Sequence, residues 1–170
     1  IDSSTLVNKG LEVMEAGWLF NLRPEQIEVV VQPKSIIHSM IQFDDGAVLA
    51  QMGVPDMKLP IQYAMTYPDR VSLSGDRLNF FDLQKIEFYK PDMETFRALQ
   101  LAYDVFSEGG SLPTVYNAAN EMAVALFLDR KIGYLQITEL IEKSINHHKK
   151  IENPTLSEVL SVEEETYSYI

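Results

Sequence analysis

The stretch that decides the fold class runs from Ser35 to Met52 and reads SIIHSMIQFDDGAVLAQM. Apolar and polar residues alternate over its first half, and one face of this expected strand is made of Ile37, Ser39, Ile41 and Phe43. A second apolar run, residues 47–52, follows directly after Asp45-Gly46. An Asp-Gly pair between two apolar runs is a strong signal for a hairpin turn. The stretch therefore predicts two antiparallel strands.

Upstream of the hairpin the sequence predicts one helix and one further strand. Residues 5–20 carry apolar side chains at helical spacing, and Ser3 or Ser4 is the expected cap. Gly10 lies inside this segment, where glycine costs up to about 1 kcal/mol relative to alanine. Either the backbone is closely approached at Gly10 or the helix starts later. The β-branched run 28–31 predicts a third strand of the same sheet.

Downstream of the hairpin a short helix is expected at 61–65, and residues 69–92 have little periodicity apart from a short extended piece at 86–89. Apolar residues then recur at helical spacing in four segments, which are Met93 to Gly109-Gly110, 113–130, 135–146, and one that Thr155 and Glu158 open as a capping box. Four helices with short connections predict a bundle. The fold class is therefore α+β, a mainly antiparallel sheet with helices followed by a C-terminal helical bundle.

The composition is that of an ordinary soluble globular protein, with 170 residues of which 46% are apolar and 23% are charged. A net charge of −11 argues against broad nucleic-acid binding. No apolar run approaches the roughly 20 residues that cross a bilayer, so no membrane association is expected. The chain has no cysteine and no signal-peptide pattern at its start, so the cytoplasm is the expected location.

The first dozen residues could hold a phosphate and a metal ion. A helix N-terminus offers free N–H groups, to which Ser3 and Thr5 add hydroxyls, Asn8 an amide and Lys9 a charge. A hard divalent metal binds carboxylate oxygen, which Glu12 can supply from the same helix face as Asn8. The alternative interpretation is a capped amphipathic helix with a Lys–Glu pair on its surface.

Other candidates have equally plain structural explanations. His38 lies within an expected strand, where a histidine is more often a sheet or interface residue than a catalyst. Met57, on a loop after a strand, could cover a flat ligand or fill a gap in a core. His147 and His148 end a helix, where cations are stabilising. The polar groups of Asn117–Glu121 lie within an apolar helix, and their role stays open.

Six short strings occur in order along nearly the whole chain. They are Asp2-Ser3-x-Thr5-x-x-Asn8-Lys9-Gly10-Leu11-Glu12, Pro33-x-Ser35-x-x-His38-Ser39-Met40, Asp45-Gly46, Leu49-Ala50-Gln51, Pro55-Asp56-Met57 and Asn117-Ala118-Ala119-Asn120-Glu121. Each string alone is weak, but together they are specific, and they resemble the 1-deoxy-D-xylulose 5-phosphate reductoisomerase family.

The resemblance implies an activity, cofactors and an assembly. The family rearranges 1-deoxy-D-xylulose 5-phosphate and reduces the product with NADPH to 2-C-methyl-D-erythritol 4-phosphate, in non-mevalonate isoprenoid biosynthesis. It requires Mg²⁺ or Mn²⁺ and is inhibited by fosmidomycin. Its members are homodimers, cytoplasmic in bacteria and plastidial in plants. A dimer built mainly from residues 28–52 is therefore expected.

The resemblance also implies roles for individual residues. Ser3 and Asn8 match ligands of the substrate phosphate, and Lys9 matches a residue at the substrate hydroxyl end near the metal. Glu12 matches the third carboxylate of the metal site. Three further matches are Ser35, by the substrate and nicotinamide, Met57, which packs on the nicotinamide, and His38, beside the active site.

The chain also departs from the family pattern. The family has an N-terminal dinucleotide-binding domain, but no G-x-G-x-x-G occurs here. Two of the three metal carboxylates are expected before residue 1. The chain is therefore expected to be an inactive fragment, with the C-terminal part of the catalytic and dimerisation domain at 1–68, a linker at 69–92 and a four-helix domain at 93–170. The alternative is a non-catalytic phosphosugar-binding or dimerisation module.

Overall fold

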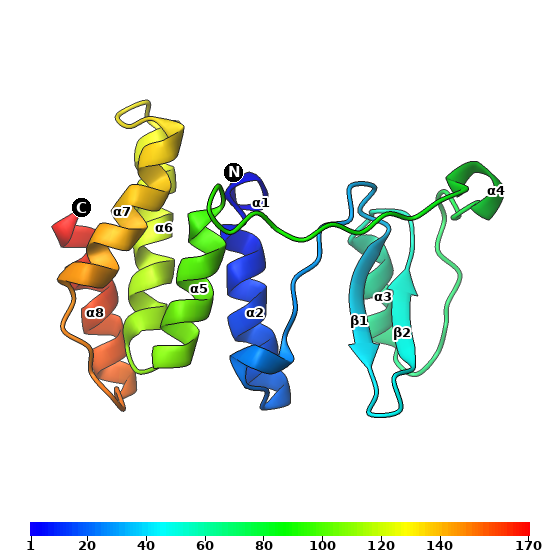
Figure 1. Cartoon of the computed structure of the whole chain (residues 1–170), viewed down its shortest axis with the longest axis horizontal. Coiled ribbons are helices and arrows are strands. Elements are labelled where there is room, and N and C mark those ends of the chain that lie inside the picture. Colours follow the sequence, from blue (N-terminus) through cyan, green and yellow to red (C-terminus); the bar gives the residue numbers. More distant parts are fainter. The chain divides into compact units, whose positions relative to one another are not determined.

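The computed structural model describes residues 1–170 and divides them into two compact units. Unit 1 comprises residues 1–29 and 91–170, and unit 2 comprises residues 30–90 (Figure 1). Contacts thus group the chain differently from the expected boundaries at 68 and 93, because the first long helix packs against helices from the second half of the chain. The expected division by role, with catalytic residues up to 68, stays a prediction.

Unit 1 is helical. Its elements are α1 (Asp2–Thr5), α2 (Val7–Phe20), a 3₁₀ turn (Pro24–Gln26), α5 (Arg97–Glu108), α6 (Leu112–Leu128), α7 (Tyr134–His147) and α8 (Leu156–Tyr169). Gly109 and Gly110 end α5 with positive φ angles of 69° and 63°, which glycine adopts without strain. Thr155 caps α8 by accepting the Glu158 N–H. The four C-terminal helices are confirmed, and so is the α+β class.

The single helix expected at 5–20 is wrong at its start. Leu6 has a φ of 61°, in the left-handed region, and this conformation separates α1 from α2. Ser3 and Ser4 lie inside α1, so neither caps α2. The hydroxyl of the buried Thr5 takes part in the junction, because it donates to the Asp2 carbonyl and accepts the Val7 N–H. Thr5 is therefore a structural residue and no longer a candidate phosphate donor.

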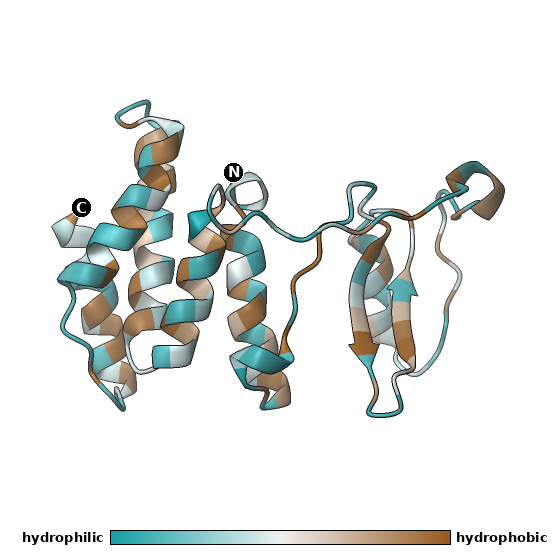
Figure 2. Cartoon of the chain, viewed as in Figure 1, coloured by the Kyte–Doolittle hydropathy of each residue, from teal (hydrophilic) through white to brown (hydrophobic).

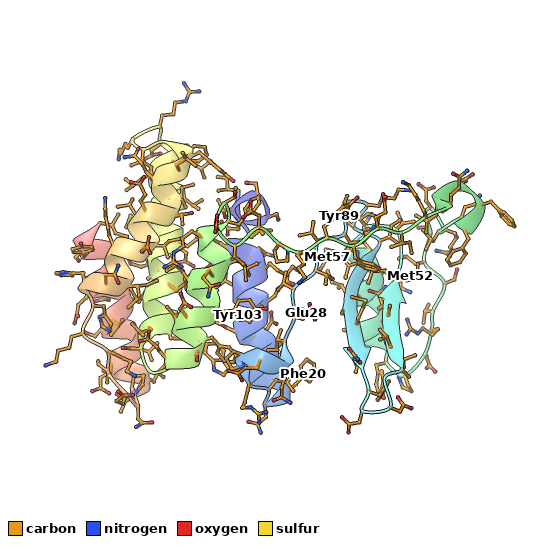
Figure 3. All side chains as sticks on the ribbon, in the orientation of Figure 1. Phe20, Glu28, Met52, Met57, Tyr89 and Tyr103 are labelled. Carbon is orange, nitrogen blue, oxygen red and sulfur yellow. The ribbon has the colours of Figure 1, made fainter.

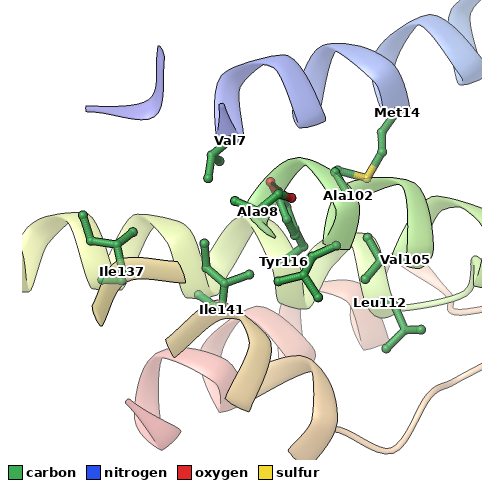
Figure 4. Packing of buried hydrophobic residues seen from close by; sticks show 12 residues of the cluster. Val7, Met14, Ala98, Ala102, Val105, Leu112, Tyr116, Ile137 and Ile141 are labelled. Atoms are coloured by element: carbon green, nitrogen blue, oxygen red, sulfur yellow. Dashed lines mark hydrogen bonds between the residues drawn. The ribbon is translucent and has the colours of Figure 1, made fainter. Parts of the chain in front are cut away.

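The core of unit 1 lies between α2, α5, α6 and α7 (Figure 4). The largest fully buried side chain is Tyr116 of α6. Around it pack side chains from all four helices, which include Val7, Met14, Ala98, Ala102, Val105, Leu112, Ile137 and Ile141. The apolar stripe of α2 therefore has its partners in the C-terminal helices. No helix of the structure combines the length and the apolar character needed to cross a membrane.

Unit 2 contains the expected hairpin. Strands β1 (Ile37–Gln42) and β2 (Val48–Met52) pair antiparallel, with Ile41 opposite Leu49. Gly46 forms the turn with a φ of 86°. The register shifts at His38, so the simple alternation expected from Ile37 onward is interrupted by an irregularity of the bulge type. Both strands are hydrophobic near the turn that joins them (Figure 2).

The other elements of unit 2 differ in part from expectation. Helix α3 (Lys58–Thr66) includes the expected 61–65 segment, whereas the one-turn helix α4 (Phe80–Leu83) was not expected. The strand expected at 28–31 is wrong, because only Val31 pairs, in an isolated antiparallel bridge with Tyr89. A β-branched run forms a strand only where a neighbour offers it a ladder, and here the neighbour pairs at one position.

Candidate functional site

Three polar side chains meet on the outer face of α2. Asn8 donates from Nδ2 to Oε1 of Glu12 over 2.6 Å, and Lys9 forms an ion pair with the other carboxylate oxygen. Residues three and four apart share a helix face, so this arrangement follows from the spacing of the sequence. The Lys9 and Glu12 side chains are 36% and 44% exposed, which leaves them accessible to a ligand.

The start of α2 adds backbone donors to these side chains. Gly10 makes the first helical hydrogen bond, from its N–H to the Leu6 carbonyl over 3.0 Å. The N–H groups of Asn8 and Lys9 precede it and have no partner within the helix. Together with the positive end of the helix dipole they favour an anion at this position. The polar face of α2 can therefore hold an anionic group beside a carboxylate.

The serines of α1 have different environments. Ser3 is exposed, consistent with its expected access to a ligand. The Ser4 hydroxyl donates to the Ile1 carbonyl over 2.6 Å and accepts from the Tyr134 hydroxyl over 3.0 Å. Ser4 thus ties α1 to α7, which leaves Ser3 as the available hydroxyl.

Ser35, His38 and Met57 belong to unit 2. Ser35 ends a turn, with a φ of 50° and an N–H that bonds to the Gln32 carbonyl, so it precedes β1 instead of opening it. His38 is exposed at the register shift of β1. Met57 is 70% exposed immediately before α3 (Figure 3). An exposed methionine at a loop–helix junction does not fill a core, which leaves it free to cover a ligand.

The remaining sequence candidates have structural roles. His147 stacks on Tyr169 with 4.1 Å between ring centroids, and Nε2 of His148 lies 2.8 Å from the Ser111 hydroxyl. In the Asn117–Glu121 string, the Glu121 carboxylate accepts from Asn117 and from Tyr167 of α8. This string therefore helps to join α6 to α8.

The chain does not by itself bring together a full set of metal ligands. No group of three or more histidine, aspartate or glutamate side chains lies close enough to hold a metal ion. Glu12 can supply one carboxylate to a site whose other ligands come from elsewhere. Its contacts with Asn8 and Lys9 orient the carboxylate, as hydrogen-bonded neighbours commonly do for metal ligands.

Two buried groups behind this face were not identified as functional from the sequence. Asp2 Oδ1 is buried without a hydrogen-bond partner, and Tyr116 is fully buried and donates to the Ala98 carbonyl over 3.1 Å. Burial raises the pKa of Tyr116, and the Asp2 charge raises it further. The unexplained Gly10 inside an apolar helix was the only available signal, because a glycine there indicates close approach by a neighbour.

Comparison with known proteins identifies the family. The sequence profile of the DXP reductoisomerase C-terminal domain matches residues 52–169. The chain belongs to the DXP reductoisomerase family. It is 60% identical over 163 residues to 1-deoxy-D-xylulose 5-phosphate reductoisomerase of Lachnospira eligens, covering 96% of the chain and 43% of the relative. The enzyme of Lachnoclostridium phytofermentans is 58% identical over 171 residues, covering 100% and 44%.

Solved structures of the family have the same fold. The reductoisomerase of Zymomonas mobilis in complex with NADPH matches with a TM-score of 0.91 and 43% identity, covering 98% of this chain and 44% of that one. A DOX-P reductoisomerase in complex with NADPH, fosmidomycin and magnesium matches with a TM-score of 0.93 and 34% identity, covering 99% and 43%. The chain thus spans less than half the length of the relatives and structures that it matches.

Proposed function

We propose that this chain is the C-terminal portion of a reductoisomerase that converts 1-deoxy-D-xylulose 5-phosphate to 2-C-methyl-D-erythritol 4-phosphate with NADPH and Mg²⁺ or Mn²⁺. The observation that carries the proposal is the convergence of Asn8, Lys9 and Glu12 on one accessible face of α2. It occurs in a chain that belongs to the family and is 60% identical to one of its members. The relatives compared are bacterial, which supports a cytoplasmic location.

Each polar group of α1 and α2 has a role in this proposal. The Ser3 hydroxyl and the Asn8 amide hold the substrate phosphate, which anchors the molecule away from its reacting carbons. Lys9 contacts the hydroxyl end of the substrate, and Glu12 provides one oxygen ligand for the metal. A divalent metal, when bound, polarises the hydroxyketone as a Lewis acid. The helix N-terminus adds charge complementarity to the phosphate.

Unit 2 contributes residues to nicotinamide binding in this proposal. Met57 packs on the nicotinamide, for which its exposure and its polarizable thioether are suited. Ser35 lies by the substrate and nicotinamide, and its φ of 50° presents it on a turn. His38 lies beside the active site without an assigned step.

The chain by itself is proposed to be inactive, because it supplies one metal carboxylate and no glycine-rich dinucleotide loop. The test compares the 170-residue chain with a chimera in which these residues replace the matching part of the Lachnospira eligens enzyme. NADPH oxidation with 1-deoxy-D-xylulose 5-phosphate and Mg²⁺ is expected for the chimera only. Turnover by the isolated chain above background contradicts the proposed inactivity, and a folded but inactive chimera contradicts the proposed function.

The second candidate is a non-catalytic dimerisation or phosphosugar-binding module. The observation that favours dimerisation is the apolar surface of the hairpin, where Ile41 and Leu49 are 62% and 63% exposed and directly opposite each other. Dimerisation itself suits both candidates, since a homodimer built from residues 28–52 is also expected for the enzyme. Turnover by the chimera distinguishes them.

A further inference from the structure

The inner face of α2 has a notch at Gly10. A Cβ atom at this position would lie 2.5 Å from the Cβ of Ala102 on α5 and 2.8 Å from the hydroxyl oxygen of Tyr116 on α6. Real Cβ atoms do not tolerate such distances, so only glycine lets α2 come this close to both helices. Figure 4 shows Tyr116 beside Ala98, with its hydroxyl end toward α2.

The notch lies directly behind the polar face. At about 100° per residue, Asn8 and Glu12 each lie roughly 160° around the helix from Gly10. A movement of α2 away from α5 and α6 therefore moves the Asn8 amide and the Glu12 carboxylate outward by almost the same distance.

The floor of the notch, which consists of the Ala102 methyl group and the Tyr116 hydroxyl, is rigid. Tyr116 is fully buried, and its hydroxyl is fixed by the hydrogen bond to the Ala98 carbonyl at the start of α5. Ala102 has no side-chain torsion with which to move away. Both groups are held by the core between α5 and α6, so the position of α2 is set by this floor.

We propose that Tyr116 and Ala102 are positioning residues, which set the distance of Asn8 and Glu12 from the helical bundle through the notch at Gly10. The inference rests on the proposed function for its effect on turnover. It assigns the C-terminal helices a part in the active site through the position of α2.

The test places a methyl group in the notch. Gly10→Ala needs the helix to move by about 1 Å to restore ordinary contact, and a misplacement of this size costs about 100-fold in rate. We therefore expect kcat/KM of the chimera to fall about 100-fold. The matched control is Gly17→Ala, two turns along the same helix, whose Cβ would meet Cζ of Phe106. This atom is the far end of a partly buried side chain, which can rotate away without moving α2, whereas the Cβ of Ala102 cannot. We expect Gly17→Ala to change kcat/KM by less than about threefold.

A rescue variant separates positioning from stability. The triple variant Gly10→Ala/Ala102→Gly/Tyr116→Phe removes both close contacts, and the remaining ring carbon lies 3.6 Å from the new Cβ. It also places glycine inside α5 and removes the Tyr116 donor to the Ala98 carbonyl, so we expect its melting temperature to stay low. A kcat/KM at least tenfold above that of Gly10→Ala supports positioning. If kcat/KM follows the melting temperature across Gly10→Ala, Gly17→Ala and the triple variant, the positioning role is overturned.

Hydrogen exchange on the 170-residue chain decides the inference independently of turnover. Gly10→Ala is expected to speed amide exchange over residues 8–12 more than Gly17→Ala does, and the triple variant is expected to restore protection. If the unsubstituted chimera is inactive, the proposed function fails, while the exchange result still supports or overturns positioning. Equal exchange in Gly10→Ala and Gly17→Ala overturns it.

Discussion

Glu12 is contacted through both of its carboxylate oxygens, by Asn8 on one side and Lys9 on the other. A pairing on the surface contributes little to stability, typically less than about 1 kcal/mol. Its more important effect is orientation, since a carboxylate held by two neighbours presents its free lone pairs in a fixed direction.

Glu12→Gln in the chimera is expected to lower Mg²⁺-dependent turnover by about 100-fold or more, because even residues that only support metal ligands cost 10–100-fold. The loss should be accompanied by weaker binding of Mn²⁺, measured by electron paramagnetic resonance. Glu15→Gln, an exposed neighbour on the same helix, is the control and should retain turnover. Unchanged activity and metal affinity in Glu12→Gln would show that the metal assignment is wrong.

His148 is expected to make stability depend on pH. Burial is the largest effect on the pKa of His148, and it lowers that pKa. The negative charge of Glu165 raises the pKa, and the neighbouring His147 lowers it by a smaller amount. The folded chain therefore binds this proton less readily than the unfolded chain, whose histidine pKa is about 6.5. As pH falls through about 6.5, the unfolded state takes up more protons and the free energy of unfolding decreases.

Urea unfolding from about pH 7.5 to about pH 5.5 measures this effect. His148→Gln should flatten the pH dependence, whereas His38→Gln, on an exposed strand, should retain it. The carboxylates of Asp92 and Glu158, whose pKa values are lowered by hydrogen bonds with Thr95 and Thr155, lose their contribution only at lower pH. The same slope in His148→Gln as in the unsubstituted chain would exclude His148 as its source.

The spacing of residues in the sequence predicted the polar face of α2, but it did not predict which residues contact Gly10 behind that face. The i, i+3 and i, i+4 relations of Lys9, Asn8 and Glu12 are local, so the pattern contains them. The contact of Gly10 with Tyr116 joins residues that are distant in sequence. Spacing alone offered two explanations for this glycine, and close approach is the correct one.

The elements with strong local signals are the ones predicted well. The Asp45-Gly46 turn and the Thr155–Glu158 box each fix their own backbone geometry. The break at Leu6 depends on tertiary contacts, because leucine has no intrinsic preference for a positive φ. The Ser4 hydroxyl illustrates this dependence, since its partner Tyr134 comes from α7.

Thr155→Ala is expected to destabilise α8. The Thr155 hydroxyl accepts the Glu158 N–H and donates to its carboxylate, while the backbone N–H of Thr155 also bonds to that carboxylate. Loss of an N-cap of this kind costs about 1 kcal/mol, which corresponds to roughly 3 °C in melting temperature. Calorimetry of the chain should detect the change. Thr155→Ser keeps the hydroxyl and should melt within about 1 °C of the unsubstituted chain.

For the whole molecule, the hairpin is the surface from which we expect assembly. Replacing Ile41 and Leu49 together by lysine puts charge on an apolar pair that is opposite in register, and like charges there repel a second copy. The molar mass measured by light scattering after size exclusion should fall from that of a dimer to that of a monomer. Lysine at Gln42, whose side chain points to the other face of the strand, is the control and should leave a dimer. A monomer for the unsubstituted chain at high concentration contradicts the expected interface.

The sequence order of the two units has a consequence for synthesis. Residues 30–90 of unit 2 separate α2 from α5, so closing a loop of about 60 residues costs on the order of 4 kcal/mol in chain entropy. At roughly 5–20 residues per second, α2 leaves the ribosome several seconds before Tyr116 exists. During that interval Val7 and Met14 have no partners and are open to chaperones. The Val31–Tyr89 bridge can form first and bring the ends of the loop together. This shortens the time that α5 needs to pack against α2.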